Sequence, residues 1–245
     1  MTQPFAEPSS WQLEVTEADN PTPRMRRILL TNPQLPAFTY LPGQDVSLAF
    51  QRSDGLTVRR RYTIRRFDPE QRWLEINVVM HGDGPGMRWA ASAKPGTRIE
   101  ALAPRGKITL AQGVDWHLFA GDSSAVPATL AMIEALNNRL PAFAFLEVDD
   151  PAERQPLDQG GTRTIAWRYG TGDGSTPQGL VSALREATLP NGRGHAYLAG
   201  EVGLVLGLKA VLLARGWPND QISAKAYWNR GKPNAERGEP EQRAS

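Results

Sequence analysis

Residues 59–66 read RRRYTIRR and place five arginines around a Tyr-Thr pair, in a segment that reads as a β-strand. Alternation along a strand puts Arg60 and Tyr62 on one face and Arg61 and Thr63 on the other. A guanidinium can bind a pyrophosphate through two parallel hydrogen bonds, and a tyrosine ring can lie against a planar ligand. The stretch fits either a strand that holds an anion or a strand whose arginines are solvated, so the rest of the chain must distinguish the two.

Short candidate strands surround this stretch and are separated by Pro, Gly, Asn and Asp. They cover residues 11–16, 25–30, 45–50, 60–65, 73–80 and 98–102, with a short helix expected at 86–93. Evenly spaced short strands with turn residues between them are typical of a closed antiparallel barrel. The sequence therefore predicts a six-stranded antiparallel barrel in residues 1–110.

After Ile108 strands and helices alternate. Strands are expected at 116–121, 142–148, 163–169, 195–201 and 222–228, and helices at 123–138, 178–187 and 202–216. This alternation predicts a mostly parallel sheet with helices on both faces. We therefore expect a second, α/β domain at residues 111–235 and a disordered polar tail at 236–245.

The composition narrows the class of protein. The 245 residues are 40% hydrophobic and 22% charged, and they contain no apolar run long enough for a transmembrane helix. The start of the chain lacks the basic and apolar regions of a signal peptide. The absence of cysteine excludes disulfides, thiolate metal sites, iron–sulfur clusters and cysteine nucleophiles. We expect a cytoplasmic monomer without membrane insertion.

The charge is unevenly distributed. Residues 1–110 hold 15 Lys and Arg against 11 Asp and Glu, whereas residues 111–245 hold 13 against 15. The basic charge of the first half lies within strand patterns, which is unlike a basic tail that binds nucleic acid. It favours an anionic small-molecule ligand and no nucleic-acid partner.

A second informative stretch is VVMHGDGPGMRWAA at residues 78–91, where a strand ends, a glycine-rich turn follows and a helix starts near Gly86. Free backbone N–H groups at a helix start bind phosphate, and glycines let a ligand approach the backbone. Taken alone, the stretch also fits a plain Gly-Pro turn, with His81 as a structural histidine. No metal-ligand spacing and no Ser-His-Asp arrangement is present, so no metal site and no catalytic side chain is expected.

The stretches taken together resemble the siderophore-interacting protein family, a branch of the ferredoxin-reductase superfamily. The ordered set is RRYTIR at 60–65, VMHGDGPGMRWA at 79–90, PRG at 104–106, AGDSSAVPAT at 120–129, YLAGE at 197–201 and YWNRG at 227–231. This ordered set is far more specific than any single member. Three positions depart from the family pattern, since Ser123 and Ser124 stand for Glu and Thr, and Ala103 stands for Gly.

The resemblance implies a flavin-binding barrel followed by a nucleotide-binding α/β domain. The residues that it implies for binding of FAD are Arg60, Tyr62, Thr63, His81, Gly82, Gly86, Met87 and Trp89. Those implied for the nicotinamide nucleotide and the surrounding domain edge are Gly121, Asp122, Ser124, Glu201 and Trp228. Arg59, Arg65 and Arg66 are the candidates for a positive surface that attracts an anionic iron chelate.

The activity that the resemblance implies is electron relay from NAD(P)H through FAD to ferric iron held by a siderophore. The cofactor supplies this chemistry, so no acid, base or nucleophile of the protein is required. Two alternatives stay open: a general NAD(P)H:flavin or ferredoxin-type reductase, and a ferric-siderophore or flavin-binding protein without turnover. The sequence names neither the siderophore nor the choice between NADH and NADPH.

Overall fold

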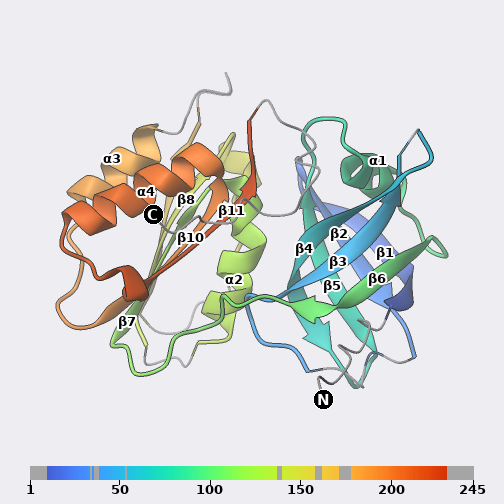
Figure 1. Cartoon of the computed structure of the whole chain (residues 1–245), viewed down its shortest axis with the longest axis horizontal. Helices are drawn as coiled ribbons and strands as arrows, with labels where there is room; N and C mark the ends of the chain where they lie inside the picture. Colours follow the sequence, from blue (N-terminus) through green and yellow to red (C-terminus); the bar gives the residue numbers. More distant parts are fainter. Residues whose placement is uncertain are drawn as a thin grey trace, which may run out of the picture. The chain divides into compact units, whose positions relative to one another are not determined.

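The chain divides into two units, Met1–Thr109 and Leu110–Ser245, which are described one by one (Figure 1). The computed structural model describes residues 10–33, 35, 39–52, 54–136, 140–157, 162–170 and 178–230. The tail expected at 236–245 lies outside the described residues. Among the described helices, none is both long and apolar enough to cross a bilayer.

Six antiparallel strands close the first unit into a barrel, in the order β1-β2-β5-β4-β3-β6. The elements are β1 (Ser10–Thr22), β2 (Met25–Thr31), β3 (Asp45–Gln51), β4 (Thr57–Asp68), β5 (Trp73–Val79), α1 (Pro85–Ser92) and β6 (Arg98–Arg105). Pairing of β1 with β6, where Leu13 lies opposite Ile99, closes the ring. The expected six-stranded antiparallel barrel is confirmed.

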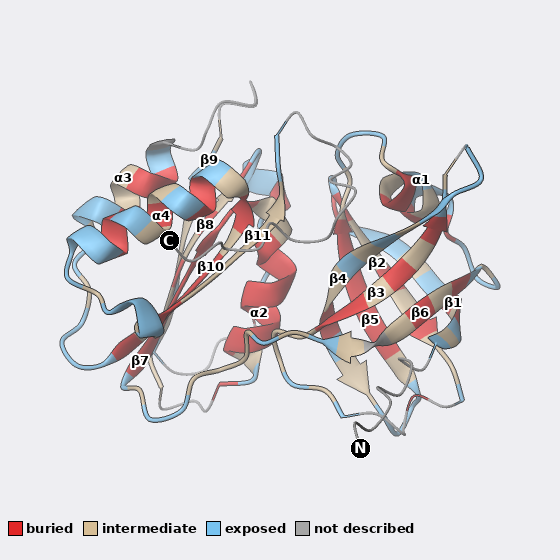
Figure 2. Cartoon of the chain, in the orientation of Figure 1, coloured by how far each residue is buried: buried red, intermediate tan, exposed pale blue. Residues whose placement is uncertain are grey.

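Alternation along the strands fills the barrel with aliphatic side chains. Leu13, Ile28, Leu48, Ile64 and Ile76 are each 0% exposed and belong to one buried cluster (Figure 2). A shift of one residue in any strand would turn these side chains to solvent, so the hydrophobic pattern fixes the register.

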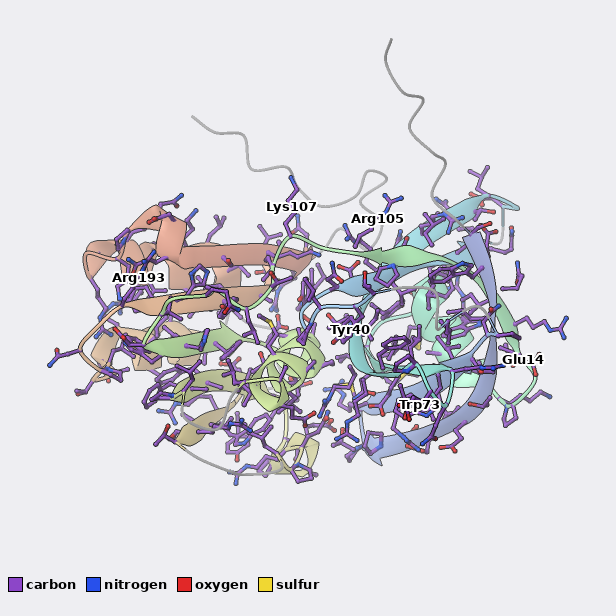
Figure 3. The ribbon with its side chains drawn as sticks, turned by 90° about the horizontal axis from the view of Figure 1, so that it is seen from below. Glu14, Tyr40, Trp73, Arg105, Lys107 and Arg193 are labelled. Carbon is purple, nitrogen blue, oxygen red and sulfur yellow. The ribbon has the colours of Figure 1, made fainter. Side chains whose placement is uncertain are left out.

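Several strands run beyond their expected ends, most of all β1, β4 and β6. Strand β1 continues to Thr22, with shifts of register between Val15 and Glu17 and between Asp19 and Thr22. Such bulges add twist and let a strand follow a curved barrel. Beside β4, the Tyr40 hydroxyl donates to the Ile64 carbonyl at 2.8 Å (Tyr40 is labelled in Figure 3).

The second unit is a parallel sheet in the order β11-β10-β7-β8-β9. Its elements are β7 (Trp116–Gly121), η2 (Ser123–Ala125), α2 (Val126–Glu134), β8 (Ala142–Val148), η3 (Pro151–Glu153), β9 (Arg163–Tyr169), α3 (Gln178–Glu186), β10 (Gly194–Glu201), α4 (Val202–Ala214), η4 (Asn219–Gln221) and β11 (Ile222–Trp228). The chain builds β7, β8 and β9 in one direction and then returns to place β10 and β11 on the other side of β7. The strand order therefore reverses between β7 and β10, which is where open α/β sheets bind ligands at the carboxyl ends of their strands.

Helices cover this sheet through apolar side chains. Leu180 and Leu184 of α3 and Leu204, Leu208 and Leu212 of α4 are each 0% exposed and form one cluster with β7 and β10. Helix α2 is buried from Val126 to Ile133. The predicted parallel α/β fold is confirmed.

The helix expected at 123–138 is shorter than its apolar pattern indicated. Residues Ser123–Ala125 form a 3-10 turn that is capped by Asp122, whose side chain accepts from the Ser124 amide, and the α-helix starts only at Val126. Pro127 has no N–H and fits the first turn of a helix, where that donor has no partner, so it marks the true start. The expected residues 137 and 138 lie outside the described residues.

A layer of aromatic and histidine side chains lies across β7 and β10. The rings of Phe119 and Tyr197 stack with centroids 4.8 Å apart. The Nδ1 atom of His117 lies 3.2 Å from the Tyr197 hydroxyl, which accepts a hydrogen bond from the Ala111 amide. His117 is 1% exposed, and its Nε2 has no partner among the described residues. Burial, aided by the nearby His195, lowers the pKa of His117 to about 4.

The buried His117 should make the protein sensitive to acid. Its pKa in the folded state lies below the ordinary value of 6.5, so its contribution to stability is complete above that pH and is lost as the pH falls towards 4. We expect protonation of His117 to lower the free energy of unfolding by on the order of 2–3 kcal/mol between pH 7.5 and pH 4.5. Urea unfolding at both values should show a smaller loss for His117→Phe than for the wild type. Equal losses in the two proteins would contradict the assignment.

Candidate functional site

Strand β4 carries the motif that opened the sequence analysis. Arg60 is partly buried, and its Nη1 donates to the Arg59 carbonyl at 2.9 Å. Tyr62 points towards the core and packs edge-on against Phe50, with ring centroids 6.1 Å apart. Thr63 lies opposite Asp45 in the ladder. The strand thus places Arg60 and Tyr62 on the same side, as alternation predicts.

The neighbouring Arg61 has a different role. Its Nε donates to Asp45 Oδ1 at 2.6 Å, and Asp45 is only 4% exposed. A buried carboxylate without a cation beside it would be costly, so Arg61 balances Asp45 on the outer side of the barrel. Arg61 therefore has a structural role in the barrel.

The start of α1 lies beside Tyr62. His81 and Gly82 are exposed in the preceding turn, and Gly82 has φ +67°. The N-cap residue of α1 is Gly84, so no side chain at that position accepts a hydrogen bond from the first amides of the helix. A Cβ atom on Gly86 would collide with the Tyr62 hydroxyl. The glycine therefore lets the phenol reach under the helix, and burial raises the pKa of Tyr62 to about 12.

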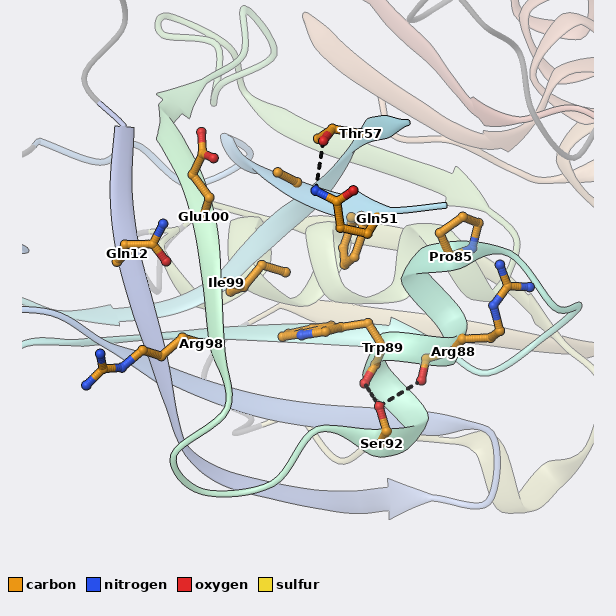
Figure 4. Close-up of a pocket in the computed structure, with 12 residues that line it drawn as sticks. Gln12, Gln51, Thr57, Pro85, Arg88, Trp89, Ser92, Arg98, Ile99 and Glu100 are labelled. Carbon is orange, nitrogen blue, oxygen red and sulfur yellow. Dashed lines mark hydrogen bonds between the residues drawn. The ribbon is translucent and has the colours of Figure 1, made fainter. Parts of the chain in front are cut away.

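A cavity of about 480 Å³ opens beside α1 in the first unit (Figure 4). Strands β3 and β6 pair only as far as Leu48 and Ala101, and the cavity occupies the space beyond, where they part. The indole of Trp89 extends from α1 towards Ile99 on β6. Its Nε1–H is shut off from solvent and has no acceptor among the described residues. The lining residues are Gln12, Ala49, Phe50, Gln51, Thr57, Pro85, Arg88, Trp89, Ser92, Arg98, Ile99 and Glu100.

The cavity could not be foreseen from the sequence. Only Trp89 among its lining residues was singled out in advance, and Met87 on the same helix is partly buried outside the lining set. Gln51 and Glu100 carry no motif, because the gap is created by the divergence of two strands that are far apart in the sequence. Barrel geometry rather than local pattern brings them together.

The three arginines expected on an exposed positive surface differ in their surroundings. Arg59 is exposed and donates to Glu100 Oε1 at 2.5 Å, and Arg66 is exposed beside Glu75 in the ladder. Arg65 is 5% exposed. The expectation that Arg65 adds to an exposed surface is therefore wrong. The ladder shifts register between Ile64 and Arg66, so simple alternation does not predict the direction of the residue between them.

In the second unit the predicted residues meet at Asp122, which directly follows β7. Its Oδ1 accepts from the backbone and hydroxyl of Ser124, at 2.9 and 2.6 Å. Its Oδ2 accepts from the Glu201 amide at 2.7 Å and from Trp228 Nε1 at 3.0 Å. Gly121 lies against β10, where a Cβ atom would collide with the Ala199 carbonyl. The motifs GDSS, AGE and YW are thus joined in space.

Glu201 serves as the N-cap of α4. Its Oε2 accepts from the Leu204 amide at 3.1 Å, which satisfies a donor at the helix start, and Oε1 accepts from the Arg230 amide at 3.3 Å. The Arg230 guanidinium lies 5.7 Å from the centroid of the Trp228 ring. Glu201 is 7% exposed, so its carboxylate is a structural element of this edge.

Sequence analysis missed Glu147 at the carboxyl end of β8. Burial, together with the negative charges of Asp122 and Asp149, raises the pKa of Glu147 to about 6. The signal was available only as a polar residue late in an apolar strand. Within the described residues, no three side chains of His, Asp or Glu gather as a metal site.

Comparison with known proteins agrees with this geometry. A model of the siderophore-interacting FAD-binding domain matches residues 47–108, and a model of the siderophore-interacting protein matches residues 114–231. The chain belongs to the siderophore-interacting protein family. The first match covers β4, the turn at His81 and α1, and the second covers all three segments that meet at Asp122.

Relatives from several bacteria share this family. Ferric vibriobactin reductase ViuB of Vibrio cholerae is 34% identical over 183 residues, which are 71% of this chain and 66% of ViuB. The crystal structure of a siderophore utilization protein from T. fusca is 31% identical with a TM-score of 0.84, covering 91% of this chain and 94% of that one. The mycobactin import ATP-binding/permease protein IrtA of Mycolicibacterium thermoresistibile is 27% identical and covers 93% of this chain, which spans 26% of IrtA.

The close approach of Tyr62 to Gly86 gives a test of the first unit. We expect Gly86→Ala to destabilise the protein by about 1–3 kcal/mol, because the added methyl group overpacks a buried contact. Tyr62→Phe removes the opposing hydroxyl, so the double variant should recover part of that loss in a double-mutant cycle measured by urea unfolding. Gly84→Ala is the matched control, since a Cβ atom there meets nothing within 4 Å. Purely additive effects of the two substitutions would contradict the contact.

Proposed function

We propose that this protein is an FAD-dependent oxidoreductase that uses NAD(P)H to reduce ferric iron in a siderophore and thereby releases Fe(II). The observation that carries the proposal is the match of residues 47–108 to the siderophore-interacting FAD-binding domain. That segment contains Arg60, Tyr62 and the start of α1, which offer the groups that a flavin dinucleotide needs. The similarity to a ferric vibriobactin reductase supports the acceptor.

The residues of the first unit fit FAD. Arg60 and the amides at the start of α1 would hold the pyrophosphate, because a guanidinium and a helix start both favour phosphate. Tyr62, Thr63, His81 and Gly82 would line the flavin. The Trp89 Nε1–H, which has no acceptor within the cavity, would find one on a ligand that enters there. When bound, FAD accepts a hydride and delivers electrons singly.

The strand order of the second unit supports NAD(P)H as the electron donor. Ligands of open α/β sheets bind at the carboxyl ends of the strands where the strand order reverses, which is between β7 and β10 here. Gly121, Ser124, Glu201 and Trp228 surround that position. We propose that the nicotinamide nucleotide binds at this edge.

The substrate would be an anionic ferric chelate. Siderophores hold iron with hard oxygen ligands, which suit Fe(III) better than Fe(II), so reduction weakens the chelate. The excess of basic residues in the first half would attract such an anion and raise its rate of encounter. Arg59 and Arg66 are the exposed candidates for this role. The protein then needs no iron ligand of its own.

The proposal is tested by a spectrum followed by an anaerobic assay. The purified protein should be yellow, NADH or NADPH should bleach it, and a ferric catecholate or hydroxamate siderophore should restore the colour while an Fe(II) trap develops. Bleaching without trapped Fe(II) would point to another acceptor, as in a general flavin or ferredoxin-type reductase. A yellow protein that neither nucleotide bleaches would support a carrier without turnover.

Two arginines of β4 should separate flavin binding from capture of the chelate. Arg60→Ala should lose most of its FAD, because the pyrophosphate loses its guanidinium, while circular dichroism shows an unchanged fold. Arg66→Ala should retain FAD and show a lower kcat/KM for the siderophore, more so at low salt. The measurements are the ratio of flavin to protein absorbance and the rate of Fe(II) trapping. Full retention of FAD by Arg60→Ala would contradict the proposed binding of the FAD pyrophosphate by Arg60.

A further inference from the structure

The carboxylate of Asp122 has no free accepting position. An ionised carboxylate accepts about four hydrogen bonds, and Asp122 receives one each from the Ser124 amide, the Ser124 hydroxyl, the Glu201 amide and Trp228 Nε1. The residue is 8% exposed. These contacts leave Asp122 little capacity to bind a nucleotide directly, although its motif placed it among the ligand contacts.

The hydrogen bonds of Asp122 join distant parts of the chain. Glu201 is 79 residues away and Trp228 is 106 residues away in the sequence. They lie at the ends of β10 and β11, and Asp122 itself follows β7. One carboxylate therefore ties together three neighbouring strand ends, and charge-assisted bonds of this kind are roughly twice as strong as neutral ones.

The backbone around Asp122 is shaped to admit the carboxylate. Gly200 has φ +134°, a backbone conformation that residues other than glycine rarely adopt. A Cβ atom there would lie 2.6 Å from Asp122 Oδ2. The room for the carboxylate thus depends on a glycine in the AGE motif. Glycine in β10 and aspartate after β7 form one physical unit.

The hydrogen bonds of Asp122 also position the start of α4 and the end of β11. Glu201, whose amide is held by Asp122, caps α4 and accepts from the Arg230 amide. Trp228, whose indole is held by Asp122, carries the Arg230 guanidinium over its ring. The start of α4 and the end of β11 are therefore both set by the same carboxylate.

We propose that Asp122 is a positioning residue, which clamps the carboxyl ends of β7, β10 and β11 and holds Glu201 and Trp228 in the arrangement that receives the nicotinamide nucleotide. This role rests on the proposed function of that edge. Asp122 acts through its neighbours and does not itself contact the nucleotide.

Asp122→Asn tests the clamp with little change of shape. The neutral amide oxygen is a weaker acceptor than the carboxylate, so each hydrogen bond that remains is weakened. If the new NH₂ group faces Ser124, the hydroxyl can turn to accept from it and only the Ser124 amide loses its acceptor, whereas on the other side the Glu201 amide and the Trp228 indole both lose theirs. We expect kcat/KM for the nicotinamide nucleotide to fall by about 10- to 100-fold, as for a small misplacement of a binding surface. The FAD content should be unchanged, because the FAD site is proposed in the first unit. The indole N–H resonance of Trp228, assigned with Trp228→Phe, should shift upfield or broaden.

Asp150→Asn is the matched control. Asp150 also caps a 3-10 turn, accepting from the Ala152 amide at 2.8 Å, but it is exposed and follows β8. It should keep wild-type kinetics and an unchanged Trp228 resonance. If Asp122→Asn does not fold, Trp228→Phe removes one donor from the same carboxylate, and should raise KM for the nucleotide and speed hydrogen exchange of the Glu201 amide.

The outcomes separate the clamp from the proposed function. An unshifted Trp228 resonance in Asp122→Asn, or kinetics equal to those of Asp150→Asn, would overturn the clamp. In the wild type, a flavin that neither NADH nor NADPH reduces would contradict the proposed donor. The inference that the clamp shapes a nucleotide site would then fail as well. The indole N–H resonance of Trp228 would still decide whether Asp122 holds Trp228.

Discussion

A single buried carboxylate holds the edge of the α/β unit together. Asp122 accepts from Ser124, Glu201 and Trp228, and so joins three strand ends that a parallel sheet otherwise connects only through its ladders. Removing one partner of a buried charged hydrogen bond leaves the remaining partner without a hydrogen bond, which lowers the stability of the folded state. The positions of the α4 start and of Arg230 depend on this arrangement. The scattered motifs of the second half are thus parts of one hydrogen-bonded structure.

The barrel relies on a different constraint, which is close packing. Tyr62 reaches under α1 only because residue 86 has no side chain, and Arg61 is held by the buried Asp45. Of the adjacent arginines in β4, Arg61 is therefore structural, while Arg60 lies on the side of Tyr62. The same strand can stabilise the barrel and present a binding surface, because its two faces alternate.

Several features of the site followed from tertiary structure alone. The cavity beside Trp89 exists because β3 and β6 part beyond Leu48 and Ala101, and no local pattern marks that divergence. Arg65 is buried because a shift of register follows Ile64, which overrides the alternation that the sequence implies. The raised pKa of Glu147 likewise comes from strands that lie side by side, since one of its causes is the charge of Asp122.

The sequence by itself determined the two folds, their order and the family. Hydrophobic periodicity and turn residues depend on near neighbours in the chain, so they can be read without coordinates. The roles of Asp122, Glu201 and Trp228 were decided only by tertiary structure. Their motifs indicated a nucleotide edge, but a carboxylate is a ligand contact or a clamp according to which donors reach it, and the donors on Glu201 and Trp228 lie 79 and 106 residues away.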